Sequence, residues 1–386
     1  MHRKKTILYI GGMELPEGNA ATQRVLANCK ILDEIGYDVI LLGVNKRKSL
    51  LRSTYSKIDN NEGLTCYSCN YPDSFLQLVW YTFSSCKVVN FLKNIDVNIS
   101  AVILYNYPAI PMLKIANYCK RHNIKTFADS TEWFLNVKNP IKNIDTFLRM
   151  RYVHFKLDGL ICISNYLANY YKKVYNVINI PSLVLRNDCN KYNYKPKKTR
   201  VFTYAGNVGN GNKDKLNLVI KCMAALNDSN IRFNIIGITE ENLFKIYDDM
   251  LEFSNFISKH VKVYGYLPRS EVGKIISESD FTVFIREPNR QTNAGFPTKL
   301  AESYSFGTPV ITTPTSNIEE YIVEGKNGFL AEDCSVPSIL EALTKALKLS
   351  DQELMSMHDF CEKCNPLDYK KFSNYFEDLL EIKNES

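Results

Sequence analysis

The stretch that decides the fold of this chain is residues 293–312, NAGFPTKLAESYSFGTPVIT. Gly295 and Pro297 predict a loop at its start. Residues 298–306 contain good helix formers and no helix breaker, so they predict a helix. The β-branched run at 310–312 then predicts a strand. The segment is therefore expected to form a loop, a helix and a strand in that order.

The start of this predicted helix is a candidate anion site. A glycine-bearing loop that leads into a helix leaves backbone N–H groups without intrahelical partners, and the helix dipole adds positive potential there. Glu302 lies one turn into the helix, where its carboxylate could accept hydrogen bonds from two hydroxyl groups, such as those of a ribose. An ordinary junction with a surface glutamate explains the same residues equally well.

The segment resembles the donor-site signature of retaining glycosyltransferases of family 4. The matching residues are Gly295, Phe296, Pro297, Glu302, Gly307, Pro309, Val310 and Ile311. The resemblance implies the GT-B fold, an α/β fold in which two Rossmann-like doubly wound domains face each other across a cleft. It also implies an enzyme of the polysaccharide, capsule or O-antigen assembly type. The signature's first glutamate, which usually binds the donor sugar, falls on Ala294, and this departure leaves the sugar contact open.

Composition supports a chain of two globular domains. The 386 residues are 45% hydrophobic and 23% charged, and the net charge is +7. This modest excess suits an anionic ligand such as a nucleotide diphosphate, or an anionic membrane surface. Nucleic acid is not an expected partner, because no nucleic-acid-binding module is recognisable.

Targeting and redox signals indicate a cytoplasmic protein. The N-terminus, MHRKKTILYIGG, lacks the apolar core of a signal peptide, and no apolar run is long enough to span a bilayer. The odd number of cysteines, eleven, fits a reducing compartment. The spacings Cys66–Cys69 and Cys361–Cys364 are typical of zinc ligands, but these pairs lie far apart and incidental spacing is the favoured interpretation.

Two arrays of alternating strands and helices follow each other along the chain. Strand 7–10, helix 20–35 and strand 37–42 form the first βαβ unit. The pattern restarts after a polar, basic linker with strand 201–205 and helix 216–226. The predicted domains are an acceptor-side domain at 1–185, a linker at 186–200, a nucleotide-sugar donor domain at 201–364, and a terminal helix at 365–386. The resemblance implies that the terminal helix packs back on the first domain.

Candidate donor-binding residues concentrate in the second array. Lys213 matches a family lysine at the start of a helix, where it suits a diphosphate oxygen. The family's arginine falls on Asn207, and Arg286, at the end of a predicted strand, could replace it or form only a loop salt bridge. Tyr266 and Leu267 are assigned to the base by resemblance. The predicted donor-binding set is Gly12, Gly206, Asn207, Lys213, Arg286, Asn293, Ala294, Gly295, Phe296, Pro297, Thr298, Lys299, Leu300 and Glu302.

The first array supplies the predicted acceptor side. Gly11, Gly12, Gly18 and Asn19 are expected to form a loop after the first strand, resembling the family loop that meets the transferred sugar. Asp129, at the end of a predicted strand, is a candidate catalytic base, with capping of the next turn as the alternative. Glu132 and this loop, through Gly18 and Asn19, are the expected acceptor-side contacts.

The predicted enzyme is a retaining hexosyltransferase that needs neither metal nor cofactor, with Asp129 and Lys213 as its catalytic residues. No Asp-x-Asp occurs, so donor binding by helix ends and cations is expected. The partners are a nucleotide sugar donor and a polysaccharide or lipid-linked glycan acceptor. The alternatives are a nucleotide-sugar epimerase of the same fold and a non-catalytic sugar-nucleotide-binding subunit.

A basic stretch and an aromatic run suggest contact with a membrane. Residues 46–52 read KRKSLLR, and residues 74–83 read SFLQLVWYTF. Together they could dock on anionic lipid headgroups at the inner face of the plasma membrane. Aromatic residues at helical spacing are more often part of a buried core, which is the favoured alternative.

Overall fold

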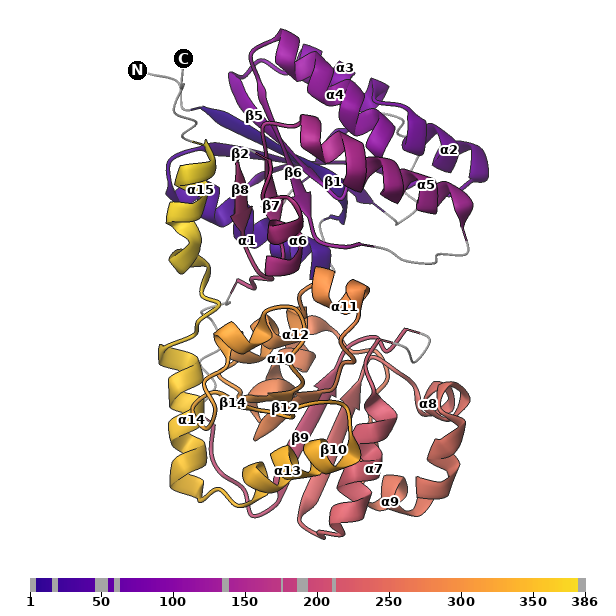
Figure 1. Cartoon of the computed structure of the whole chain (residues 1–386), viewed down its shortest axis with the longest axis vertical. Helices are drawn as coiled ribbons and strands as arrows, with labels where there is room; N and C mark the ends of the chain where they lie inside the picture. Colours follow the sequence, from indigo (N-terminus) through magenta and orange to yellow (C-terminus); the bar gives the residue numbers. More distant parts are fainter. Residues whose placement is uncertain are drawn as a thin grey trace. The chain divides into compact units, whose positions relative to one another are not determined.

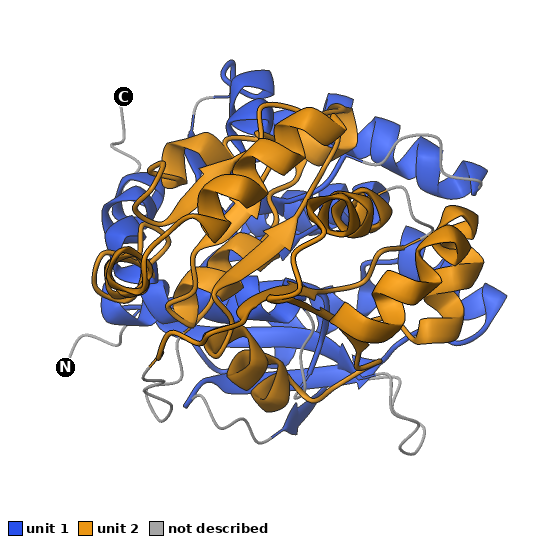
Figure 2. Ribbon diagram, turned by 90° about the horizontal axis from the view of Figure 1, so that it is seen from below, with its two compact units in different colours: residues 1–183, 369–386 blue, residues 184–368 orange. Residues whose placement is uncertain are grey.

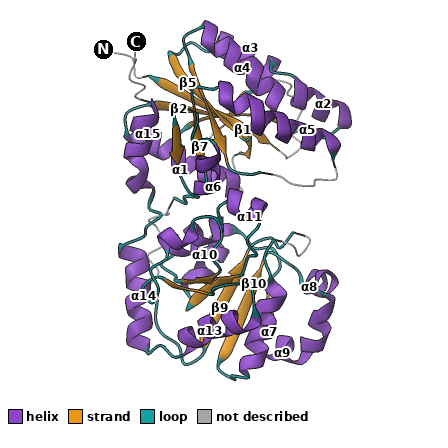
Figure 3. Ribbon diagram, viewed as in Figure 1, coloured by secondary structure: helices purple, strands orange, loops and turns teal. Residues whose placement is uncertain are grey.

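The computed structural model describes residues 5–15, 20–45, 55–58, 63–133, 139–174, 176–185, 194–209 and 213–380. The chain forms two compact units, shown in Figure 2. Unit 1 comprises Met1–Leu183 and Tyr369–Ser386, and unit 2 comprises Val184–Asp368. Each unit is built around its own sheet (Figure 3). Most of the predicted linker, and the basic stretch 46–52, lie outside the described residues.

The described part of unit 1 contains an eight-stranded sheet in the order β3-β4-β2-β1-β5-β6-β7-β8. Neighbouring strands are parallel except for β3, which pairs antiparallel to β4. The runs 7–10 and 101–104 are buried in the centre, as expected for strands covered on both faces. The strands are β1 (Thr6–Glu14), β2 (Asp38–Asn45), β3 (Ser56–Ile58), β4 (Thr65–Asn70), β5 (Ile99–Tyr105), β6 (Lys125–Ser130), β7 (Gly159–Cys162) and β8 (Val177–Asn179).

Two groups of helices pack on this sheet (Figure 1). In one group α1 contacts β1, β2 and α15, and in the other α4 contacts β6 and its neighbours α2, α3 and α5. The C-terminal helix α15 contacts β8, where Asn176 Nδ2 donates a 2.8 Å hydrogen bond to the backbone oxygen of Leu379. The helices are α1 (Ala20–Glu34), α2 (Phe75–Phe83), α3 (Cys86–Asn94), α4 (Ala109–Arg121), α5 (Pro140–Leu148), α6 (Asn165–Tyr170) and α15 (Ser373–Leu380).

The described part of unit 2 contains a six-stranded, fully parallel sheet in the order β11-β10-β9-β12-β13-β14. Its strands are β9 (Arg200–Ala205), β10 (Ile231–Ile236), β11 (Val261–Val263), β12 (Phe281–Phe284), β13 (Val310–Thr312) and β14 (Gly328–Leu330). Its helices are α7 (Leu216–Leu226), α8 (Glu240–Ile246), α9 (Ser254–His260), α10 (Arg269–Ser277), α11 (Arg290–Ala294), α12 (Thr298–Ser305), α13 (Val336–Leu347) and α14 (Asp351–Lys363).

Strand order reverses once in each parallel array. In unit 2 the chain proceeds outward from β9 to β10 and β11, and then returns to place β12 on the other side of β9. In unit 1 the same reversal lies between β1 and β5. Open parallel sheets bind ligands at the carboxyl ends of the strands that flank such a switch point. The edge of β9 and β12 is therefore the place to look for a site in unit 2.

The glycines after the first strand do not form the predicted loop. Strand β1 continues through Gly11 and Gly12 to Glu14. Gly11 pairs with Tyr105 of β5, and a Cβ at Gly11 would lie 2.8 Å from the Cβ of Tyr105. Close packing of neighbouring strands, rather than a turn, therefore requires this glycine. Gly18 and Asn19 lie outside the described residues.

The described residues contain no group of three potential metal ligands among their His, Cys, Asp and Glu side chains. Cys66 and Cys69 lie in β4, where residues three apart point to opposite faces of the sheet. Their spacing is thus unsuited to a shared ion. Over the same described part, no helix has the length and apolar character that a membrane span requires.

Burial of His358 predicts a pH-dependent stability for unit 2. Burial lowers the pKa of this imidazole to about 4, and its ring stacks on Tyr194 with 3.5 Å between centroids. The unfolded state binds the proton near the ordinary pKa of about 6.5. Stability is therefore expected to fall as the pH drops from about 6.5 to about 4, by about 3 kcal/mol at 1.36 kcal/mol per pKa unit. Denaturant melts of wild type and His358→Gln across this range measure the difference, and parallel pH profiles would contradict the expectation.

Candidate functional site

The carboxyl ends of β9 and β10 expose backbone rather than side chains. Gly206 follows β9 with φ +147°, and a Cβ there would lie 2.5 Å from both Cε and Nζ of Lys299. Gly237 follows β10 with φ +97°, and its Cβ would lie 2.5 Å from the backbone oxygen of Gly206. These two glycines let the Lys299 side chain cross the end of β9 at close range.

A buried carboxylate collects the polar side chains at this edge. Asp214 accepts hydrogen bonds from Tyr204 Oη at 2.7 Å, Arg286 Nε at 2.5 Å and Lys299 Nζ at 2.8 Å. Tyr204 lies in β9, Arg286 follows β12, and Lys299 lies in the first turn of α12. These four residues are called the Asp214 cluster below. The cluster therefore joins the two strands of the switch point to the start of α12.

The Asp214 cluster carries one net positive charge. Burial by itself would raise the pKa of Asp214, but Lys299 and Arg286 outweigh it and hold the pKa well below its usual range. The carboxylate is ionised and faces two cations. The Lys299 side chain is 14% exposed, and its ammonium has further N–H donors beyond the one that Asp214 accepts. The site can therefore receive an anion.

The start of α12 adds backbone donors next to this cation. Helix α12 begins at Thr298, and its N-cap, Pro297, makes no side-chain capping hydrogen bond. The first N–H groups of the helix are thus available to an anion beside Lys299. The edge of unit 2 thus combines an ammonium held by Asp214 with the amide dipoles of a helix start, and both kinds of donor suit phosphate.

Glu302 lies one turn further along α12. Burial raises the pKa of its carboxyl group, and Arg269 and Lys299 act in the opposite direction. No side-chain hydrogen bond to this carboxylate is found among the described residues. The carboxylate can therefore accept hydroxyl donors from a ligand bound at the start of the helix.

Other residues of the predicted donor set have structural partners. The Asn207 carboxamide oxygen accepts the Gly209 N–H at 2.7 Å, and that of Asn293 accepts the Ser316 N–H at 3.0 Å. Ala294 is fully buried, and the ring of Phe296 packs edge-on against Tyr321 with 5.5 Å between centroids. The Ala294 methyl group is therefore part of the core, and the assignment of Ala294 to the donor site stays a prediction that concerns its backbone.

For the remaining residues of the predicted donor set the structure gives a position and an exposure, and their contact with a donor stays a prediction. Lys213 is exposed and adjoins Asp214, Tyr266 is an exposed ring after β11, and Leu267 is half-buried. Gly12 lies in β1 of unit 1, and Gly295 and Leu300 frame the start of α12. Sequence reasoning missed Tyr204 and Asp214. The only local signal of Asp214 was its position directly after the candidate Lys213.

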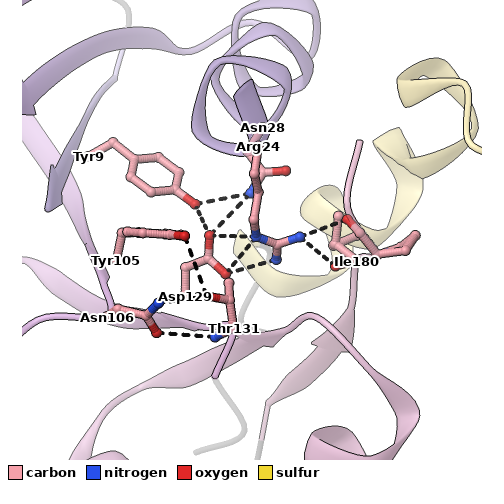
Figure 4. A network of polar contacts seen from close by, with 9 residues as sticks. Tyr9, Arg24, Asn28, Tyr105, Asn106, Asp129, Thr131 and Ile180 are labelled. Carbon is pink, nitrogen blue, oxygen red and sulfur yellow. Dashed lines mark hydrogen bonds and ion pairs between the residues drawn. The ribbon is translucent and has the colours of Figure 1, made fainter. Parts of the chain in front are cut away.

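Asp129 is buried rather than presented to a substrate (Figure 4). It lies in β6 and accepts hydrogen bonds from Tyr9 Oη at 2.6 Å and Arg24 Nη2 at 2.8 Å. Arg24 Nε donates to Asp129 Oδ2 at 3.1 Å, and Asn28 Nδ2 donates to the same oxygen at 3.4 Å. A carboxylate that is fully buried and already paired with a cation is not presented to an acceptor hydroxyl, so the predicted role as catalytic base is corrected to a structural one.

Arg24 makes this network a junction between distant segments. Its Nη1 donates to the backbone oxygens of Ile180 at 2.8 Å and Pro181 at 2.7 Å, while its other nitrogens bind Asp129. Figure 4 shows the guanidinium lying between α1, β6 and the segment after β8. Burial first, and Asp129 second, raise the pKa of Tyr9 well above its ordinary value, so its hydroxyl stays a donor. Arg24 was not identified from the sequence.

A second contact orders the ends of β5 and β6. Asn106 Nδ2 donates to Thr131 Oγ1 at 2.6 Å, and the Thr131 N–H donates to Asn106 Oδ1 at 3.2 Å. Glu132 follows directly and is exposed. Its predicted contact with the acceptor stays a prediction.

Comparison with known proteins agrees with this architecture. Residues 188–362 match the family described as glycosyl transferases group 1. The chain is 27% identical over 222 residues to the uncharacterized glycosyltransferase MJ1178 of Methanocaldococcus jannaschii, a match that spans 57% of this chain and only 56% of that relative.

Solved structures match over nearly the whole chain. The apo form of the lipopolysaccharide outer core galactosyltransferase WaaB superposes with a TM-score of 0.61 at 16% identity, covering 96% of this chain and 99% of the other. The catalytic domain of starch synthase IV from Arabidopsis thaliana, bound to ADP and acarbose, gives a TM-score of 0.73 at 10% identity, covering 98% and 99%. At such identities the likeness concerns the fold, which is GT-B, and the expected fold is confirmed.

Proposed function

Because residues 188–362 belong to the glycosyl transferases group 1 and the chain has the GT-B fold, we propose that this protein transfers a sugar from a nucleoside diphosphate sugar to a hydroxyl group. The acceptor is a polysaccharide or lipid-linked glycan, and the anomeric configuration is retained. The observation that carries the proposal is the Asp214 cluster beside the uncapped start of α12, at the switch point of unit 2.

The proposed chemistry is electrostatic stabilisation of the leaving diphosphate. As the bond to the anomeric carbon breaks, negative charge grows on the diphosphate oxygen. Lys299 and the first amides of α12 face that charge, and Asp214 fixes the position of the Lys299 ammonium at 2.8 Å. Donors that are already oriented toward developing charge usually contribute the largest part of such catalysis. Lys213, which directly precedes Asp214, is a second cation near this edge, and we assign it to the outer side of the diphosphate.

The proposed function is tested by nucleotide release. The full chain is incubated with UDP-, GDP- and ADP-sugars, with and without a lipid extract of a bacterial cell envelope. Nucleotide release that occurs with one of these donors, and only when the extract is present, supports sugar transfer. A non-catalytic sugar-nucleotide-binding subunit, which the departures at Ala294 and Asn207 favour, would bind a donor and release no nucleotide. An epimerase would interconvert donors without release, and the absence of a carboxylate at Ala294 counts against it.

Glu302 is proposed to hold the ribose hydroxyls of the donor. Glu302→Ala is expected to weaken nucleoside diphosphate binding by about 1–3 kcal/mol, the typical cost of losing hydrogen bonds to a charged group. Isothermal titration measures the change. Glu341→Ala, which removes an exposed glutamate of α13 that pairs with Lys345, is the matched control and should leave the affinity unchanged. If wild type and Glu302→Ala bind the nucleoside diphosphate with equal affinity, Glu302 does not hold the ribose.

Donor binding is proposed to be independent of metal. The sequence has no Asp-x-Asp, and Lys299 and Arg286 provide the positive charge that a bound cation otherwise supplies. Nucleotide release is expected to continue at a similar rate in EDTA. Complete loss of activity that manganese or magnesium restores would show instead that the donor phosphate needs a divalent ion.

We also propose that the protein works in the cytoplasm and contacts the inner face of the plasma membrane. A lipid-linked acceptor would be presented at that surface. The support for a membrane contact is a surface of unit 1, which is described next.

A further inference from the structure

Helix α2 exposes apolar side chains along one stripe. None of its residues is buried. Leu76 is 78% exposed, Trp80 49% and Phe83 41%, and their spacing of four and three residues places them on one face of the helix. Phe75 and Leu78 are also exposed beside this stripe. A short helix of a soluble domain normally buries its apolar face, so this face is available to a partner.

Helix α5 and the residues after it expose a second apolar stripe. Ile141, Ile144 and Phe147 follow each other at intervals of three residues and are all exposed. Tyr152 and Phe155 continue the exposed apolar surface beyond the end of the helix. The ring of Phe147 lies 5.8 Å from that of Tyr152 between centroids, so these two rings continue the exposed surface past the end of the helix.

Both stripes are anchored to α4. Lys114 Nζ of α4 donates to the backbone oxygen of Phe83 at the end of α2, at 3.1 Å. The first amide of α4, at Ala109, donates to Asp145 Oδ1 of α5 at 2.7 Å. Figure 1 shows α2 and α5 at the same end of unit 1. The exposed apolar residues of 75–83 and 141–155 are called the α2–α5 surface below.

Cations accompany these apolar side chains. Lys87 Nζ lies 5.9 Å from the ring centre of Trp80, and the Arg151 guanidinium lies 5.2 Å from that of Phe147. Lys142 is exposed on α5. The carboxylate of Asp145 is half-buried and accepts the Ala109 amide. The α2–α5 surface thus combines apolar and aromatic side chains with positive charge.

We propose that the α2–α5 surface docks on a bilayer that contains anionic phospholipids. Aromatic and aliphatic side chains enter the boundary between headgroups and acyl chains, while lysine and arginine contact the phosphates. A second copy of this chain suits the surface less well. In a two-fold symmetric contact the same patch meets itself, so the positive charges of Lys87, Lys142 and Arg151 would be brought close to those of the second copy. This docking rests on the membrane contact proposed above and names its surface and lipid. Because docking is measured without a sugar donor, its failure would leave the proposed sugar transfer untouched.

Tryptophan fluorescence tests the docking directly. The chain has two tryptophans, Trp80 and Trp133, so Trp133→Phe leaves Trp80 as the single reporter on the α2–α5 surface. The full-length variant is mixed with vesicles of phosphatidylcholine and phosphatidylglycerol. A blue shift of Trp80 emission and co-sedimentation with these vesicles are expected. Vesicles of phosphatidylcholine alone should bind much less.

Two charge-introducing variants decide where the contact lies. Leu76→Glu, made in the same background, is expected to lower vesicle affinity at least tenfold. Leu251→Glu changes a similarly exposed leucine of unit 2, 65% exposed, and should bind like the parent. Thermal melts and nucleoside diphosphate titrations check that both variants are folded, because neither leucine contributes to the core. Equal vesicle binding by the Leu76 variant and the parent would overturn the proposal.

A third arm separates lipid from self-association. Lys142→Glu with Arg151→Glu is expected to weaken binding to anionic vesicles about tenfold or more, in line with the contribution of basic residues near such a surface. Sedimentation velocity measures the oligomeric state of parent and Leu76→Glu. No vesicle binding together with a dimer that Leu76→Glu dissociates would assign the surface to a second copy and refute membrane docking.

Discussion

Asp129→Ala is expected to lower the free energy of unfolding of unit 1 by about 3–5 kcal/mol, the cost of leaving one member of a buried ion pair without its partner. Arg24 is 2% exposed, and without Asp129 its Nε and Nη2 lose their acceptors. Both tryptophans lie in unit 1, so urea denaturation followed by tryptophan emission reports on this unit. Nucleoside diphosphate affinity, which depends on unit 2, should change little in native buffer.

A double variant separates a structural pair from a catalytic carboxylate. Arg24→Met with Asp129→Leu removes both charges and should be more stable than Asp129→Ala, because no uncompensated charge remains. One outcome would restore the role of Asp129 as catalytic base. In that case Asp129→Ala would retain wild-type stability and lose activity while nucleotide binding remains normal.

Lys299→Ala is expected to lower kcat for nucleotide release by about 10²–10³-fold, the range observed when one pre-oriented donor to a developing oxyanion is removed. Lys299 Nζ is held at 2.8 Å by Asp214 over Gly206, where the diphosphate is proposed to lie. An interaction that strengthens as charge develops appears in kcat. Binding of the nucleoside without phosphates should be almost unchanged.

Two lysines next to Asp214 in the segment between β9 and α7 provide the comparison. Lys215 pairs with Glu287 at 3.0 Å, and Lys215→Ala should retain kcat. Lys213→Ala tests the cation that was identified from the sequence. If Lys299→Ala retains near-normal kcat while Lys213→Ala loses it, the diphosphate lies on Lys213 and Lys299 serves only as a partner of Asp214.

Elements with local start and stop signals could be predicted from the sequence. Helix 216–226 and strand 310–312 are predicted with the bounds that the structure shows. Each is a short apolar or helix-forming run between residues that interrupt regular structure, so neighbours in sequence decide its limits. The expected GT-B fold followed from the order of such elements together with the family resemblance.

The polar networks could not be predicted in this way. Asp129 and Arg24 are 105 residues apart, and Asp214 and Lys299 are 85 residues apart. No periodicity or spacing links such positions, because only the strand order of the finished sheet brings them together. Asp129 therefore resembled a free carboxylate after a strand, and the arginine that neutralises it was not considered.

Gly11 and Gly12 show a related ambiguity. Two glycines after an apolar run predict a turn, yet β1 continues through them because Gly11 lies against Tyr105 of β5. A glycine provides either a positive φ or room for a neighbouring strand, and the residue type is the same in both cases. Only the pairing of β1 with β5 distinguishes them.

The edge of unit 2 formed by the Asp214 cluster and the start of α12 is proposed to bind the diphosphate of a nucleotide sugar. Isothermal titration of the full chain with UDP, GDP and ADP, and with uridine, guanosine and adenosine, measures this binding. One nucleoside diphosphate is expected to bind far more tightly than its nucleoside, and Lys299→Ala is expected to remove most of this difference. Equal affinities for the diphosphate and the nucleoside, or a difference that Lys299→Ala leaves intact, would contradict it.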